Sequence, residues 1–208
     1  MDQNDDALIV RWDGPLLGTI SGNSFALLAQ NNDTQIGIDI FNDSSTDFTD
    51  LGILGNTFDI RGDGNGATNN RNFGLIIEID SDGALNISNN AIELQGGDAT
   101  AIELDLDGEV ELLIATNSIQ DQFDVLFASD YEGIDIDRIG EGSLLVFDNN
   151  LIDIDGDFGL RVDAFGVIEL DGPDRPNTIF AFNFGSQDFI FTGPTPIGQL
   201  NINGNLLP

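Results

Sequence analysis

One pattern recurs through most of this chain of 208 residues: an asparagine with alternating apolar residues on both sides. The clearest example surrounds Asn90, where Leu85 and Ile87 come before the asparagine and Ile92 and Leu94 follow it. Alternation of apolar and polar residues is typical of short β-strands, and no helical stretch separates them. The same frame occurs around Asn23, Asn56, Asn90, Asn117, Asn150 and Asn205.

The repeats are irregular in length but regular in their strands. Most of the asparagines lie roughly 30 residues apart, and the last interval is about twice as long. We expect the missing repeat of that interval within residues 179–191. Each repeat also contains a second alternating strand, at residues 36–41, 75–80, 101–106, 133–138 and 160–165. Regular strands joined by segments of variable length predict a solenoid.

The repeated asparagine suits a corner of such a coil. Stacked parallel strands lie about 4.8 Å apart, and the chain must bend sharply between them. An inward-facing asparagine can bond to the same residue one turn above and one turn below, which satisfies amides that would otherwise be buried without a partner. We therefore interpret all six asparagines as a structural ladder.

This frame of strand, asparagine corner and strand resembles the right-handed parallel β-helix of pectate-lyase-like and bacterial surface proteins. The resemblance covers roughly residues 15–165 and 198–207, and it implies an all-β solenoid of about seven turns. The alternative is a β-sandwich, which also uses many short strands. We expect one domain over residues 1–208, with a partial N-terminal cap at 1–15 and less regular Phe- and Pro-rich turns at 172–208.

Composition excludes several classes of function. The net charge is −31, from 37 acidic and 6 basic residues, so the surface repels nucleic acids and anionic membranes. The chain has no His, Cys or Lys, which excludes His-containing triads, Cys nucleophiles, Lys Schiff bases and the usual zinc sites. The acidic surplus without Lys favours a protein in salty or calcium-rich surroundings, and we expect an extracellular or cell-surface location.

Outward-facing carboxylates are expected to stack in columns along the second strands. One predicted column joins Asp39 to the first acidic residue of the later strands, and another lies two residues further on. Like charges at strand spacing repel each other, and calcium would relieve that repulsion. The alternative is a solvated acidic face screened by salt. The candidate calcium ligands are Glu78, Asp80, Glu103, Asp105, Asp135 and Asp137.

A polysaccharide lyase is the alternative function that the resemblance implies, with an Arg or Lys base beside calcium-binding aspartates. Only arginines are present, and the candidates are Arg138 near Asp135 and Asp137, and Arg161 near Asp157 and Asp163. Both also fit surface ion pairs that relieve a crowded acidic face. The arginines are scattered over different turns, so we assign no catalytic residue.

A β-helix has two open ends, and each end is an unpaired strand edge. The sequence stops within a repeat, which is typical of a module from a longer solenoid or of a subunit that stacks head to tail. We therefore expect a non-enzymatic structural or adhesive module. Its expected partners are further copies stacked into a filament, the rest of a longer surface protein, or a polysaccharide.

Overall fold

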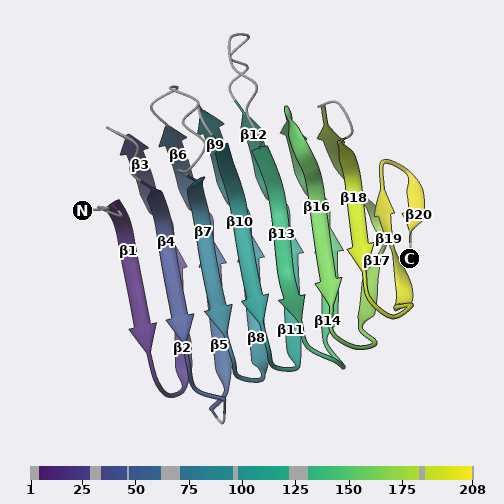
Figure 1. The fold of residues 1–208 in the computed structure, drawn as a ribbon, viewed down its shortest axis with the longest axis horizontal. Coiled ribbons are helices and arrows are strands. Elements are labelled where there is room, and N and C mark those ends of the chain that lie inside the picture. Colours follow the sequence, from purple (N-terminus) through teal and green to yellow (C-terminus); the bar gives the residue numbers. More distant parts are fainter. Residues whose placement is uncertain are drawn as a thin grey trace.

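The computed structural model describes residues 5–28, 34–45, 47–61, 71–95, 98–121, 131–182 and 186–207, apart from the side chains of residues 5, 71 and 173–175. Every regular element in these ranges is a β-strand. They therefore contain no apolar helix that could cross a membrane. The strands stack side by side along one axis, with the two ends of the chain at opposite ends of the stack (Figure 1).

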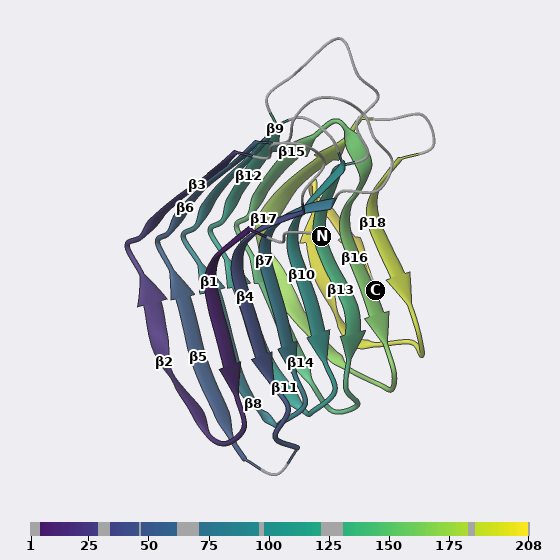
Figure 2. The same cartoon turned by 60° about the vertical axis from the view of Figure 1, so that its left-hand side comes forward.

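The strands form three parallel sheets, A, B and C, that surround one core (Figure 2). Sheet A consists of β1 (Asp5–Trp12), β4 (Gln35–Asn42), β7 (Arg71–Ile79), β10 (Asp98–Leu106), β13 (Tyr131–Ile139), β16 (Gly156–Ala164) and β18 (Gln187–Thr192). Sheet B consists of β2 (Leu16–Ser21), β5 (Thr49–Leu54), β8 (Gly83–Ser88), β11 (Val110–Ala115), β14 (Leu144–Asp148), the first part of β17 (Glu169–Ala181), β19 (Ile197–Ile202) and β20 (Asn205–Leu207). Sheet C consists of β3 (Ser24–Leu28), β6 (Thr57–Arg61), β9 (Ala91–Gln95), β12 (Ser118–Asp121), β15 (Leu151–Ile154) and the second part of β17.

The predicted all-β parallel solenoid is confirmed, although its turns are not all alike. Five coils, β1–β3 to β13–β15, have one separate strand in each sheet, which is fewer than the seven turns predicted. In the next coil the single strand β17 serves both sheet B and sheet C. The last strands, β18 to β20, form an altered end in which β20 runs antiparallel to β19. The predicted cap at residues 1–15 contains β1, which pairs in parallel with β4 as a regular strand of the first coil.

Inward-facing apolar residues fill the space between the three sheets. In the second coil, Ile38 of sheet A, Ile53 of sheet B and Phe58 of sheet C are fully buried. Later coils place apolar residues at the same register positions, so the core is a continuous column along the axis. Alternation in the sequence therefore marks the buried face of each strand, as expected for half-buried strands.

The asparagine ladder lies at the corner between sheets B and C. At Asn90, the backbone N–H and the side-chain Nδ2 both donate to Oδ1 of Asn117, at 3.0 and 3.1 Å. Nδ2 of Asn90 also donates to the carbonyl of Ile53 on the preceding coil, at 2.8 Å. Bonds from one rung to the next join Asn23, Asn56, Asn90, Asn117, Asn150 and Asn177. The ladder predicted at one corner is therefore present.

Asn177 is the rung missing from the predicted series, and it lies two residues before the range 179–191 in which the missing repeat was expected. The last predicted rung, Asn205, makes no rung bond among the described residues. Asn205 is exposed on β20, after a tight turn in which Asn203 and Gly204 both have positive φ. An Asn-Gly pair is a strong signal for such a hairpin, and it reverses the chain before another corner can form. The sequence frame missed Asn177 because the corner before it is longer than in the preceding coil. The segment from Asp171 to Thr178 has two more residues than the segment that it is paired with, from Val146 to Leu151.

A column of small residues sets the register of sheet A and was not anticipated. Gly37, Gly74, Ala101, Gly133 and Gly159 lie one above another on neighbouring strands. A Cβ atom at Gly37 would lie 2.5 Å from the carbonyl oxygen of Gly74 and 2.8 Å from the ring of Phe58. Sheet A therefore approaches the side chains of sheet C closely at this column, which only the smallest residues allow.

Removal of a central rung should destabilise the fold strongly, and removal of Asn205 should not. Asn117→Ala leaves the backbone N–H and side-chain amide of Asn90 without their acceptor. Each unsatisfied buried polar group costs about 1–3 kcal/mol, so we expect urea unfolding to show a loss of about 3 kcal/mol or more. Asn177→Ala should behave similarly, and the exposed control Asn205→Ala should stay within about 0.5 kcal/mol of the unmodified protein. Equal losses at Asn177 and Asn205 would contradict the ladder described above.

Candidate functional site

Most of the predicted carboxylates lie on the outward side of sheet A, here called the acidic face. Its register differs from the predicted columns at β7. Glu103 lies between Ile76 and Asp135, so Ile76 takes the position predicted for Glu78. Glu78 instead lies opposite Asp105. The shift by two residues follows from the alignment of Gly74 with Gly37 and Ala101, which the acidic residues alone do not reveal.

The remaining predicted ligands also occupy different neighbourhoods. Asp80 follows β7 and lies near Asp107 and Asp43, whose charges repel it. Asp105 lies opposite Arg138 of the next strand, because a register shift in β13 displaces Asp137 from the predicted column. The six predicted residues therefore share one face but do not form the two predicted columns.

Burial and crowding raise the pKa values of several carboxyl groups on this face. For Glu78, partial burial is the main cause, and repulsion from Asp105 and Asp39 adds to it. Burial also raises the pKa of Asp80 and of Asp105, and Arg138 partly opposes the shift at Asp105. Each of these groups therefore holds its proton at a higher pH than a free carboxyl group does.

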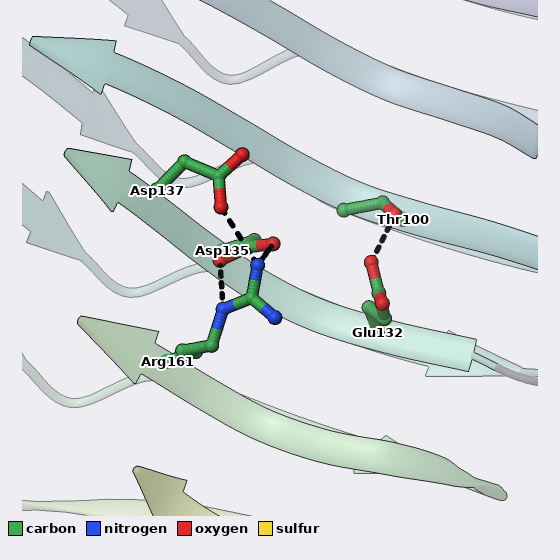
Figure 3. Close-up of polar contacts among 5 residues, drawn as sticks. All are labelled: Thr100, Glu132, Asp135, Asp137 and Arg161. Carbon is green, nitrogen blue, oxygen red and sulfur yellow. Dashed lines mark hydrogen bonds and ion pairs between the residues drawn. The ribbon is translucent and has the colours of Figure 1, made fainter. Parts of the chain in front are cut away.

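Arg161 of β16 connects two of the predicted residues (Figure 3). Its Nε donates to Oδ1 of Asp135 at 2.8 Å, and its Nη2 contacts both Oδ2 of Asp135 and Oδ1 of Asp137, the latter at 2.7 Å. The guanidinium group also lies 4.8 Å from the ring centre of Phe158. Asp135 is only 1 % exposed although it faces outward, because the arginine side chain covers it.

Asp135 is the most strongly shifted carboxyl group among the described residues. Burial raises the pKa of Asp135 to about 7, and repulsion from Asp137 adds to the shift. The charge of Arg161 and its hydrogen bond oppose the shift without cancelling it. A second polar pair lies beside this group, where the hydroxyl of Thr100 donates to Glu132 at 2.7 Å (Figure 3).

The other arginines with described side chains are held in the same way. Arg11 donates to both carboxylate oxygens of Asp39 on the neighbouring strand, with 2.6 Å between Nη1 and Oδ1. Arg138 contacts Asp107 at 2.6 Å and lies 3.6 Å from Asp105, both on the preceding coil. On sheet C, Arg61 binds both oxygens of Asp59. Arg138 and Arg161 thus pair with the coil before their own, which sequence neighbours could not show.

This arrangement suits charge neutralisation better than acid–base catalysis. A lyase base must give up its proton, whereas hydrogen bonds and neighbouring carboxylates raise the pKa of Arg138 above its usual value. The pKa of Arg161 is also raised, because attraction to Asp135 and Asp137 exceeds the opposing effect of burial. Both candidate bases are therefore held in their charged form by carboxylates that face them.

No group of three or more carboxylates within the described ranges converges in a way that could hold a metal ion. The predicted calcium ligands lie instead as a line of neighbours along the face, and Arg138 and Arg161 neutralise part of it. Calcium binding therefore stays a prediction. An ion would have to bridge neighbouring strands rather than enter a preformed cage.

The melting temperature should fall as the pH rises from 5 to 8. A folded-state pKa above the unfolded value gives stability that is present at low pH and lost as the pH rises through the folded pKa, which is about 7 for Asp135. Differential scanning fluorimetry should show a decrease of about 5 °C for a chain of this size. Asp135→Asn should flatten this dependence, and the exposed control Glu111→Gln on sheet B should keep it. An unchanged slope in Asp135→Asn would contradict the assignment.

Calcium should stabilise the acidic face by more than ionic screening alone. We expect millimolar calcium chloride to raise the melting temperature above its value in sodium chloride of equal ionic strength, and EDTA to reverse the gain. Glu78→Gln removes one carboxylate next to Asp105 and should reduce the effect. Equal melting temperatures in calcium and sodium salts would contradict calcium binding and would mean that salt only screens the carboxylates.

Comparisons with known proteins identify no family for this chain. No protein-family model, no curated protein and no solved structure matches the chain. The functional argument therefore depends on the physical properties of the described coils, above all on the charged face of sheet A and on the two ends of the solenoid.

Proposed function

We propose that this chain is a non-enzymatic structural or adhesive module, extracellular or on a cell surface, that associates through the ends of its solenoid. The observation that supports it best is the state of the first coil. Within the part of the chain that the structure describes, β1, β2 and β3 are each the last strand of their sheet, with a neighbouring strand on one side. An unpaired edge offers backbone donors and acceptors to another chain.

The interior of the first coil is also incompletely covered. Leu8, Ile20 and Phe25 are only partly buried, although each faces the core. Their partners one coil further on, Ile38, Ile53 and Phe58, are fully buried. Apolar side chains gain roughly 1.5–3 kcal/mol each on complete burial, so a further layer on this end would be favourable.

The body of the solenoid suits a stiff spacer. Each coil bonds to its neighbours through sheets A, B and C and through the asparagine ladder, so the coils cannot move independently. The four arginines whose side chains the structure describes all pair with carboxylates of the same molecule, which leaves a strongly acidic outer surface. Such a surface keeps the sides of neighbouring molecules apart and leaves the ends as the place of contact.

Self-association should increase with both protein and salt concentration. Two copies with a net charge of −31 repel each other, and the screening length falls from about 30 Å at 0.01 M salt to about 8 Å at 0.15 M. Sedimentation velocity at increasing protein concentration should show larger species, and more of them at the higher salt concentration. A monomer at every concentration and salt level would contradict the proposed function.

A further inference from the structure

The outward-facing residues of the first coil differ in chemistry from those of the second. Ile9, Leu17 and Leu28 are 52 %, 65 % and 61 % exposed. Their register partners on the second coil are Asp39, Asp50 and Arg61. The first coil thus has apolar residues at three outward positions, one on each sheet, where the next coil has charged ones. A rim of this kind around an open edge is typical of a surface that another protein covers.

The opposite end of the solenoid is closed along sheet C by side chains. The Ile179 N–H donates to Oδ1 of Asn203 at 2.9 Å, and Nδ2 of Asn203 donates to the Ile179 carbonyl at 2.5 Å. The Ala181 N–H donates to Oδ1 of Asp188 at 3.2 Å, and its carbonyl accepts from the Ser186 hydroxyl at 2.6 Å. The backbone groups that would receive a further strand on sheet C are therefore occupied.

The hairpin closes part of sheet B at the same end. Strand β20 runs antiparallel to β19, with Leu200 opposite Leu207 and Ile202 opposite Asn205. A parallel coil from another copy could not continue the sheet from that strand in the direction of the other coils. Head-to-tail stacking would need all three sheets to continue in parallel, and two of them do not offer that edge.

Charge permits contact at either end but does not select one. Residues 14–32, which include β2 and β3, carry no charge, and neither do residues 189–208. Both ends therefore carry less charge than the densely acidic middle coils, although β1 adds Asp5, Asp6 and Arg11 to the first coil. Among the described residues, all three sheets end in an open strand at the first coil, whereas at the C-terminal end only sheet A does, at β18.

We propose that the first coil, Asp5–Leu28, is the interface of a two-fold symmetric dimer, in which it contacts the first coil of a second copy. This inference rests on the proposed function and replaces an open filament with a closed pair. A two-fold axis perpendicular to β1 and β2 makes each of these strands antiparallel to its copy, so identical edges can pair. The rim residues Ile9, Leu17 and Leu28 then lie beside the seam, and the core side chains of both coils become buried.

Leu17 and Ile197 form a matched pair for testing this interface. Both lie in one outward column of sheet B, which runs from Leu17 through Asp50, Ala84, Glu111, Leu144 and Glu169 to Ile197. They are similarly exposed, at 65 % and 62 %, and stand at opposite ends of the solenoid. A charged substitution at either site leaves the core intact, and circular dichroism verifies the fold.

Sedimentation equilibrium of the full chain at high salt is the decisive measurement. We expect a species of twice the monomer mass, about tenfold or more weaker dimerisation in Leu17→Glu, and no change in Ile197→Glu. Leu28→Glu provides a second rim variant on sheet C and should act like Leu17→Glu. Weakening by Ile197→Glu equal to that by Leu17→Glu would overturn the two-fold dimer.

The outcomes also separate this inference from the proposed function. Species that grow beyond the dimer with concentration would support association through the ends but overturn the closed pair. A monomer under all conditions would overturn both. A dimer that neither Leu17→Glu nor Leu28→Glu weakens would place the contact away from the first coil, and it would also overturn the inference.

Discussion

The hydrogen bonds of the corner asparagines are the interaction on which the rest of the solenoid depends. A coil of three short strands must turn sharply, and each turn removes backbone groups from the regular sheet pattern. One asparagine side chain accepts two bonds from the rung before it and donates to the coil before and the rung after, as at Asn117. The residue before the rung takes a left-handed conformation, as at Asn89 with φ 59°. The same side chain thus provides hydrogen-bond partners for the backbone at the corner and links each coil to the next.

Arginines neutralise a few carboxylates of the acidic surface locally, and the rest of the surface stays strongly acidic. Arg11, Arg138 and Arg161 each bond to a carboxylate on a neighbouring coil and lie over a phenylalanine ring. Exposed ion pairs contribute little to stability, but a buried carboxylate left without its arginine would be costly. Asp135 shows the limit of this arrangement, because burial shifts its pKa more than Arg161 can offset. The ion pairs of the acidic face are therefore best explained as structural, because they reduce repulsion between carboxylates on neighbouring strands.

The sequence predicted the strands and most of the ladder because both depend on local periodicity. Alternation marks the buried face of a strand directly, and the corner asparagine recurs at fixed offsets from it. Long-range register could not be read in the same way. Glu78 was placed beside Glu103 because acidic residues were aligned, whereas Gly74 sets the alignment through its close approach to the next coil. The ion pairs of Arg161 depend on the register of β13 and β16, which places Asp135 opposite Arg161, so sequence neighbours such as Asp163 were poor guides.

The two ends of the solenoid differ for a reason that is visible in individual residues. At the C-terminal end, the side-chain amide of Asn203 accepts a hydrogen bond from the Ile179 N–H and donates one to the Ile179 carbonyl. It thereby occupies the backbone groups to which a further strand would bond. In the first coil, Nδ2 of Asn23 donates to the Ser21 carbonyl at 3.1 Å, and the described residues place no further strand beyond β1, β2 or β3. Three outward positions of this coil, Ile9, Leu17 and Leu28, are apolar and exposed. A protein that only avoided association would protect both edges with charge or side-chain caps. Both ends carry exposed apolar residues, but the C-terminal end leaves only β18 of sheet A open, so continuation of the sheets is favoured at the first coil. Contact through one end alone gives a finite assembly rather than an endless one.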